Sequence, residues 1–488
     1  MKYFLPALAL SLLCVSCANT ASDSKEIAKQ KITNQDTAPG SLPRNIIMVI
    51  GDGMGPAYTS AYRYFSDNPD TSEIEETVFD RHLVGSSSTY PARVSGYITD
   101  SAASATALAT GVKTYNNAVG IDVSKKEVQT VLEWAKLQGK KTGVVVTSQI
   151  NHATPASYLA HNEHRYNYNE IADSYIDNGI KADLYFGGGW KYFIRDDRNL
   201  VNEFKQAGFH YIDDYAGLSN IPPEKPVLGL FANSGLPWAL DDVNNNQLTT
   251  MTKAALTKLE SEQGFFLLVE GSKVDWAGHS NDIAAAMAEM DDLAKTVEYL
   301  ETYVAKHPDT LVVITADHST GGLALGKWTG YSDKKVKSKY LWQPQFIRKM
   351  NMSPEAISKK IASEVLSIDE ISALLTFDIT PEEYTLLNNA KLESKIAESN
   401  YNKLPRSART LKYPPKGYTL ILKSIKKIID KKTNTGWGSI SSSASHNPVD
   451  VQVFSFGSKS DIFRGFQDNT DIAKKIFTLL GKQSSTVK

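Results

Sequence analysis

Several long apolar runs in this chain end abruptly in an acidic residue or a histidine. Three of them are Asn45–Ile50, Phe265–Val269 and Thr310–Thr315. The first leads through Gly51 into Asp52, the second directly into Glu270, and the third through Ala316 into Asp317. Unbroken apolar runs of this length are typical of strands buried on both faces of a parallel sheet. The polar residues that follow them should then gather at the carboxyl edge of that sheet, where α/β proteins bind ligands.

Helical patterns alternate with these strands. We expect a further strand at Lys141 to Ser148 and a long helix at Asn281 to Val304, whose apolar positions recur at helical spacing. Met287 and Met290 on this stripe are best explained as core packing. The pattern predicts the α/β fold class, with a large central, mostly parallel sheet covered by helices on both faces.

A serine stands at the start of a small-residue helix in the segment Ile98 to Thr106. Asp100 or Thr99 can cap this helix, which puts Ser101 in its first turn among alanines. The backbone N–H groups and the positive end of the helix dipole would face a phosphoryl or carboxyl group bound at Ser101. A serine in a capped, alanine-rich helix is ordinary by itself, so its interpretation depends on the rest of the chain.

Acidic residues and histidines follow the predicted strands in separate clusters. The candidate metal ligands are Asp52, Glu270, Asp275, His279, Asp317, His318 and His446. Neutral imidazole combined with carboxylate suits zinc, whereas oxygen ligands alone suit magnesium. We therefore expect more than one metal ion.

Four segments of the chain resemble the alkaline phosphatases in sequence, order and context. They are Ile50–Gly55, Thr99–Ala103, Val269–Asp275 and Thr315–His318, and Asp183–Gly189 resembles a further segment of that family. The resemblance extends from about Arg44 to Lys327 and resumes at Thr435. Because four ordered segments agree, the match is specific.

The resemblance implies two zinc sites, a third site for magnesium, and a phosphoserine intermediate on Ser101. The first zinc would be held by Asp275, His279 and His446, the second by Asp52, Asp317 and His318, and the magnesium by Asp52, Thr154 and Glu270. Arg165 matches the arginine that binds the substrate phosphate in this family. Its planar guanidinium can meet two phosphoryl oxygens at once.

Three positions depart from the family pattern. His152 stands where some bacterial members have an aspartate, so the third site either binds magnesium less tightly or accepts zinc. Trp276 follows Asp275 where other members place Lys or His, which removes a polar group beside the metal ligands. His446 is followed by Asn447-Pro448 in place of Thr-Gly, although the approach through Thr435 to Trp437 still fits.

Composition and the N-terminal segment indicate an exported enzyme. The 488 residues are 41% hydrophobic and 22% charged with a net charge of −1, which argues against a nucleic-acid partner. Residues 1–17 read as a signal peptide, since Lys2 precedes an apolar run too short to span a membrane. Cys17 resembles a lipoprotein processing site, and ordinary cleavage nearby is the alternative. We expect a periplasmic protein, anchored to the outer membrane if Cys17 is lipidated.

The remaining chain divides into a catalytic part and an insertion. We expect a flexible tether at 18–42, a catalytic domain at 43–327 and 435–488, and an inserted cap or crown at 328–434, here called the crown region. The crown region would lie over the pocket or at the interface of a homodimer. Its basic run Lys423 to Lys432 is most simply the solvated face of a helix, with contact to a membrane surface as the minor alternative.

These features predict metal-dependent hydrolysis of small phosphate monoesters to inorganic phosphate and an alcohol. A related metal-dependent phosphodiesterase is one alternative, although Glu270 with Thr154 favours the monoesterase. A sulfatase is disfavoured because its modification motif is absent. The non-enzymatic alternative is a surface lipoprotein that binds zinc or phosphate, in which Ser101 would be no more than a helix residue.

Overall fold

The computed structural model describes residues 42–242, 246–328, 340–411, 414–438 and 445–483. The chain from Ser41 onward forms one compact unit. The signal peptide at 1–17, Cys17 and the tether at 18–42 lie outside the described residues, apart from Leu42 itself. Among the helices within these ranges, none combines the length and the apolar character needed to cross a membrane.

Ten strands of the described chain form the central sheet. In spatial order they are β16 (Gly465–Asp468), β2 (Leu83–Ser88), β15 (Val451–Gly457), β8 (Thr310–Thr315), β1 (Asn45–Gly51), β7 (Phe265–Gly271), β3 (Lys141–Gln149), β4 (Leu184–Gly188), β6 (Val227–Leu230) and β5 (His210–Ile212). Strand β15 runs antiparallel to both of its neighbours, and the other pairings are parallel. The predicted mostly parallel sheet is confirmed.

Three two-stranded ladders lie outside the central sheet in the described chain. They are β9 (Ser319–Thr320) with β14 (His446–Asn447), β10 (Leu323–Leu325) with β13 (Thr435–Trp437), and β11 (Lys327–Trp328) with β12 (Tyr340–Leu341). The helices of the catalytic part are α2 (Pro56–Ser66), α3 (Val78–His82), α4 (Ser101–Thr110), α5 (Val131–Leu137), α6 (Ala153–Leu159), α7 (Tyr168–Asp177), α8 (Trp190–Phe193), α9 (Leu200–Gln206), α10 (Gln247–Leu259), α11 (Lys273–Ser280), α12 (Ile283–Lys306) and α17 (Asn469–Leu479).

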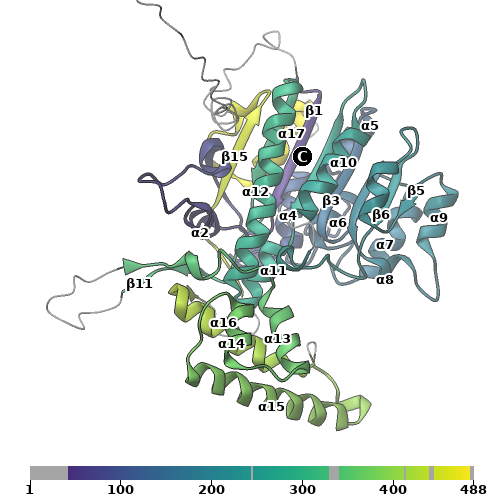
Figure 1. Ribbon diagram of the computed structural model, residues 1–488. Coiled ribbons are helices and arrows are strands. Elements are labelled where there is room, and N and C mark those ends of the chain that lie inside the picture. Colours follow the sequence, from purple (N-terminus) through teal and green to yellow (C-terminus); the bar gives the residue numbers. More distant parts are fainter. Residues whose placement is uncertain (1–41, 243–245, 329–339, 412–413, 439–444, 484–488) are drawn as a thin grey trace, which may run out of the picture. The chain divides into compact units, whose positions relative to one another are not determined.

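Helices cover both faces of the sheet, as predicted (Figure 1). Alternate residues of β1 belong to different cores: Ile47 and Val49 pack with α2, α10 and α12, whereas Ile46 and Met48 pack with α4, α5, α6 and α17. A strand with both faces buried must be apolar at every position, which explains the unbroken run in the sequence. The expected Met287 and Met290 stripe lies in the first of these cores.

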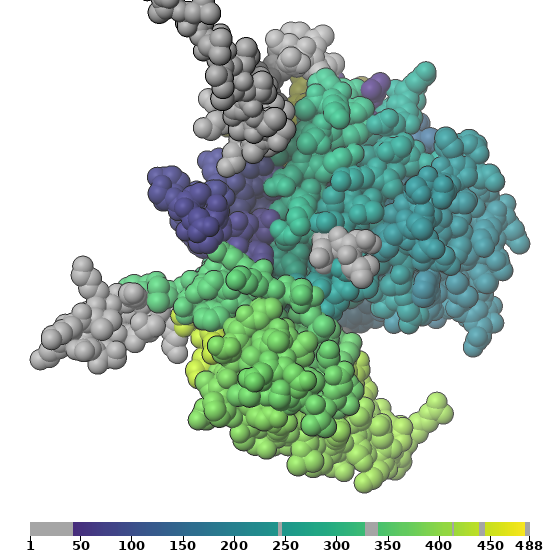
Figure 2. Space-filling model, in the orientation of Figure 1, coloured from purple at the N-terminus to yellow at the C-terminus, as the bar shows by residue number. Residues whose placement is uncertain are grey.

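The crown region contains four helices in its described part. They are α13 (Pro354–Ser363), α14 (Ile368–Leu375), α15 (Pro381–Lys403) and α16 (Thr419–Thr433). Their apolar side chains belong to the same core as α12. The space-filling view shows these green segments as one continuous surface (Figure 2). The boundaries of the crown region as a separate domain stay a prediction.

The basic run of the crown region needs one correction. Lys423, Lys427 and Lys431 are exposed on α16, which agrees with a solvated face. Lys426 lies on another side of the same helix and donates a hydrogen bond to the carbonyl of Ser280, at the end of α11. Lys426 is only partly exposed, whereas Lys423 and Lys427 on the same helix are exposed, so the run is not uniformly solvated.

Glu133 joins three segments that support the sheet. It closes a capping box with Thr130 at the start of α5, and its carboxylate contacts His161 at 2.9 Å and Lys181 at 2.6 Å. Burial alone would raise the pKa of Glu133, but the hydrogen bond with His161 and the charge of Lys181 outweigh it and lower the pKa from 4.5 to about 2. The ionised carboxylate therefore stabilises the folded state.

We expect Glu133→Gln to lower the free energy of unfolding at pH 7 by roughly 2–3 kcal/mol, because that stabilisation corresponds to the depressed pKa. Since the folded pKa lies below the unfolded one, the stabilisation is present above about pH 4.5 and is lost as the pH falls toward 2. Chemical denaturation at pH 7, 4 and 3 measures it. Glu163→Gln, which breaks the exposed pair with Lys125, is the control and should change stability by less than about 1 kcal/mol.

Candidate metal centre

Four adjacent strands deliver the candidate ligands to one edge of the sheet. Asp52 follows β1, Glu270 is the last residue but one of β7, Asp317 follows β8, and His152 follows β3. The register pairs Ile50 of β1 with Glu270, so neighbouring strands end at the same level. Parallel strands thereby bring together side chains that are far apart in the sequence.

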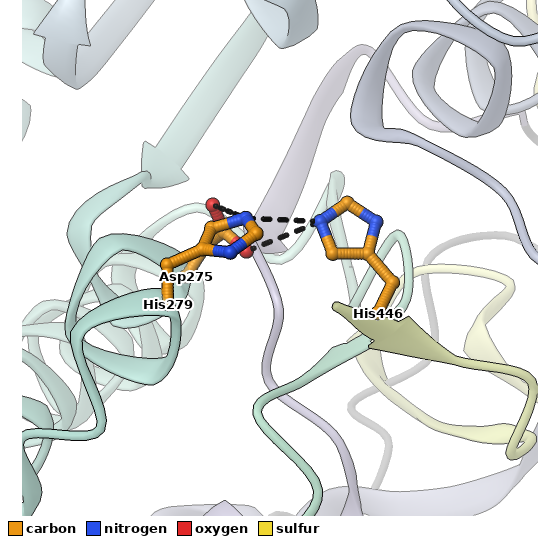
Figure 3. A group of neighbouring side chains, drawn as sticks. All are labelled: Asp275, His279 and His446. Atoms are coloured by element: carbon orange, nitrogen blue, oxygen red, sulfur yellow. Dashed lines mark hydrogen bonds and ion pairs between the residues drawn. The ribbon is translucent and has the colours of Figure 1, made fainter. Parts of the chain in front are cut away.

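The first group of ligand atoms is formed by Asp275, His279 and His446. Asp275 and His279 lie one turn apart on α11 and face His446, which comes from β14 (Figure 3). The Nε2 atoms of His279 and His446 are 3.1 Å apart, and the Asp275 carboxylate lies 3.4 Å from His279 and 3.7 Å from His446. Three donors that converge in this way can hold a cation between them.

His446 is held in place by backbone pairing and by a carbonyl. Strand β14 pairs with β9, which sets His446 opposite Thr320. Nδ1 of His446 lies 2.8 Å from the carbonyl of Thr99. Because a carbonyl only accepts, Nδ1 carries the proton and Nε2 presents its lone pair to Asp275 and His279, as a metal-binding histidine requires.

The second group consists of Asp52, Asp317 and His318, all fully buried. Nε2 of His318 lies 3.2 Å from Asp317 and 3.5 Å from Asp52. The other oxygen of Asp317 accepts backbone N–H groups from Gly53 and His318, each at 3.0 Å. These two hydrogen bonds fix the carboxylate of Asp317, and its Oδ2 is left facing Nε2 of His318.

The third group contains Asp52, His152 and Glu270. Thr154, in the first turn of α6, is fully buried, and its hydroxyl makes no hydrogen bond within the described chain. From its place in the sequence, His152 is expected beside this site as a neighbour of the ligands. The structure puts one of its ring nitrogens within 4.8 Å of carboxylate oxygens of Asp52 and Glu270, which makes it a candidate ligand.

Ser101 begins α4, and its side chain lies beside the second group. The carboxylate of Asp100 caps the helix by accepting the N–H of Ala103 at 3.0 Å, so Asp100 and not Thr99 is the cap. The Ser101 hydroxyl lies 3.1 Å from Nε2 of His318. A serine at a helix N-terminus next to clustered ligands has the arrangement expected of a nucleophile that attacks an anion.

Arg165 lies within reach of the same helix end. Its Nη1 pairs with Asp100 at 2.9 Å, and its Nη2 lies 3.4 Å from His152. Burial would lower the pKa of Arg165, but the charge of Asp100 outweighs it and raises the pKa. The ring of Trp276 meets the ring of His152 edge to face at 5.8 Å. Trp276 therefore packs on the histidine that Arg165 contacts.

The charges of the site are unbalanced without a cation. Burial, reinforced by Asp317, raises the pKa of Asp52 well above its ordinary value, and burial raises the pKa of Glu270 to about 8. Neither oxygen of Asp52 accepts a hydrogen bond from the described residues, nor does Oε1 of Glu270 or Oδ2 of Asp317, whose one close contact is the 3.2 Å pair with His318. Buried carboxylates with open oxygens cost several kcal/mol unless a cation neutralises them. The donor sets therefore fit metal ions.

Thr320 is a residue of the site that the sequence analysis did not identify. Its hydroxyl donates to Asp275 at 2.6 Å and lies 3.2 Å from Nδ1 of His318. It therefore contacts one ligand from each of the first two groups. The signal in the sequence that could have indicated Thr320 as a site residue is its position two residues after His318 and directly before Gly321-Gly322. A threonine in a short polar segment has many possible roles, so this signal is weak.

The chain resembles proteins of one family throughout. A family model described as alkaline phosphatase matches residues 43–482. Alkaline phosphatase 3 of Bacillus subtilis (strain 168) is 40% identical over 487 residues, covering 98% of this chain and 97% of that protein. The crystal structure of the cold-active alkaline phosphatase from the psychrophile Shewanella sp. is 46% identical, has a TM-score of 0.79, and covers 89% of this chain and 99% of that one.

A more distant structure shares the fold. It is a variant of the alkaline phosphatase from the Antarctic bacterium TAB5, described with Mg bound in its M3 site. It is 24% identical, has a TM-score of 0.62, and covers 91% of this chain and 99% of that one.

We expect removal of metal by a chelator to lower the thermal midpoint by on the order of 5 °C, because the clustered carboxylates lose their neutralising cations. In the absence of metal, Asp52→Asn should raise the thermal midpoint above that of the metal-free parent. The amide removes a buried charge and keeps the shape of the side chain. Scanning calorimetry of both proteins with and without chelator measures this. Equal midpoints for the metal-free parent and variant would contradict the role assigned to Asp52.

Proposed function

Because the chain belongs to the alkaline phosphatase family and is an enzyme, we propose that it hydrolyses phosphate monoesters through a phosphoserine intermediate on Ser101. The observation that carries this proposal is the position of Ser101, at a capped helix N-terminus and 3.1 Å from His318. Small phosphate monoesters are the proposed substrates, and inorganic phosphate and an alcohol are the products.

We assign two zinc ions and one magnesium ion to the three groups of donors. Asp275, His279 and His446 would hold one zinc, and Asp52, Asp317 and His318 the other. Asp52 and Glu270 with Thr154 would hold magnesium, and the imidazole of His152 makes this site suitable for zinc as well. When bound, such ions supply Lewis acidity that favours serine alkoxide and stabilises the leaving oxygen.

The residues of the chain account for the rest of the reaction. The oxygen of Ser101 forms a bond to phosphorus as the bond to the alcohol oxygen breaks. A water molecule then cleaves the bond between phosphorus and Ser101, which releases inorganic phosphate and regenerates the hydroxyl. Arg165 and the N–H groups at the start of α4 balance the charge on the remaining phosphoryl oxygens. Asp100 orients Arg165 while it caps the helix.

Membership of the family excludes the non-enzymatic alternative, while a diesterase activity stays open to test. The presence of Glu270 beside Asp52 in the third group, together with the buried hydroxyl of Thr154, favours the monoesterase. Comparison of rates on an aryl phosphate and on the corresponding diester separates the two activities.

Export and assembly are further parts of the proposal. We propose that residues 1–17 direct the protein to the periplasm and that Cys17 carries a lipid anchor to the outer membrane. We also propose a homodimer. These statements rest on the sequence, and the first two concern residues outside the described part of the chain.

We expect protein starting at Ala18 to release phosphate from an aryl phosphate between pH 7 and 10, to lose activity with chelator and to regain it with zinc and magnesium. Ser101→Ala should lower kcat by at least about 10³-fold, because the nucleophile is absent. Acid quenching with labelled phosphate should trap label on the parent and on the exposed-site control Ser124→Ala, and not on Ser101→Ala. Label on the Ser101→Ala protein would overturn the assignment of the nucleophile.

Arg165→Lys should weaken phosphate binding roughly tenfold or more, since a lysine keeps the charge but cannot present a planar fork to two oxygens. The loss should appear in the KM for the aryl phosphate and in the inhibition constant of inorganic phosphate. An unchanged inhibition constant would show that Arg165 does not contact the phosphoryl group.

A further inference from the structure

The C-terminal end of α11 is held by the crown region. Helix α11 carries Asp275 and His279, and Lys426 of α16 donates a hydrogen bond to the carbonyl of Ser280, the last residue of α11. The final carbonyls of a helix have no partner within the helix, and a cation there interacts favourably with the helix dipole. Lys426 therefore satisfies the carbonyl that follows directly after His279.

Lys426 is placed between two acidic residues of different segments. Burial lowers the pKa of Lys426, whereas the charges of Asp282 and Asp430 raise it. Asp282 caps α12 by accepting the N–H of Ala285 at 3.0 Å, and Asp430 accepts a hydrogen bond from the indole of Trp437 at 3.1 Å. One lysine thus ties α16 to the junction between α11 and α12, and its partners are themselves fixed.

The N-terminal end of α11 reaches the crown region through one intermediate side chain. The ammonium group of Lys273 donates to the carbonyl of Leu236 at 2.8 Å and lies 4.0 Å from the centre of the Trp238 ring. The indole of Trp238 in turn donates to Glu355 of α13 at 3.0 Å. Both ends of a helix of eight residues are therefore connected to helices of the crown region.

We propose that α13 and α16 of the crown region clamp α11 and so position Asp275 and His279 against His446. Lys426 and Glu355 are then positioning residues for the first zinc site. The third donor, His446, is held by its pairing with β9 and by the carbonyl of Thr99, which lie outside α11. A displacement of α11 would therefore separate two donors from the third. This inference rests on the proposed function, because it takes the first group of donors as a zinc site.

The test compares zinc affinity in the full-length chain and its variants by competition with a chromophoric chelator. Lys426→Met should weaken binding of one zinc equivalent about tenfold, the size typical of lost support around metal ligands. Its kcat should fall at limiting zinc and return at saturating zinc, with KM unchanged. Glu355→Ala should act in the same direction, and Lys426→Arg, which keeps a cationic donor, should retain most of the affinity.

Lys427→Met is the matched control, because Lys427 is the exposed neighbour on the same helix and should leave zinc affinity unaltered. Parental zinc affinity in both Lys426→Met and Glu355→Ala overturns the clamp, even if their thermal midpoints fall, since that pattern indicates a purely structural role. If Lys426→Met does not fold, the zinc affinity of Glu355→Ala decides the question. A parent protein that binds no zinc, or that releases no phosphate, counts against the proposed function instead.

Discussion

The structure depends on one electrostatic constraint, the concentration of buried carboxylates at a single edge of the sheet. Asp52, Glu270, Asp275 and Asp317 are at most 3% exposed, and they lie close enough to affect one another's ionisation. A protein interior tolerates such a group only when positive charge is supplied. His318 and Arg165 supply part of it, and the open oxygens of Asp52 and Glu270 require more. We therefore expect metal binding and folding to be coupled in this protein.

The surrounding elements serve to keep these charges in fixed positions. The backbone N–H groups of Gly53 and His318 hold Asp317, the hydroxyl of Thr320 holds Asp275, and the carbonyl of Thr99 holds His446. Each of these partners is itself buried, so its position is fixed by the packing around it. Such hydrogen bonds select one tautomer or one carboxylate oxygen, and this leaves the remaining lone pairs directed at the cation.

The crown region fits the same interpretation. A cap that only covered a pocket would need apolar contacts with the core, and the crown region has them. It also places Lys426 at the end of α11 and Glu355 next to Trp238, where apolar packing alone would need no charged groups. These two contacts lead to the ends of the helix that carries Asp275 and His279, while Arg348 and Ser353 join the crown region to the end of α2 and to Asp241. The insertion thus connects to the site through the helix that bears two of its ligands.

The sheet, the faces covered by helices and the identity of the chemical groups could be predicted from the order of the residues. An apolar run such as Asn45–Gly51 is buried on both faces whatever its neighbours are, and the acid after it must lie at the carboxyl edge. The family resemblance then supplied roles for Ser101, Arg165 and the metal ligands. Local signals were sufficient for these features because strand burial and helix capping involve residues close together in the chain.

Which side chains meet could be read only from the folded chain. His152 lies among the atoms of the third group, Thr320 bridges two groups, and Lys426 turns away from its solvated neighbours to the end of α11. In each case at least one partner is distant in the sequence, as Asp275 is from Thr320 and Ser280 is from Lys426, and no periodicity along the chain records the contact. Pairwise placement depends on the register of the strands and the packing of the helices. These are properties of the whole fold, and the order of residues in any one segment does not contain them.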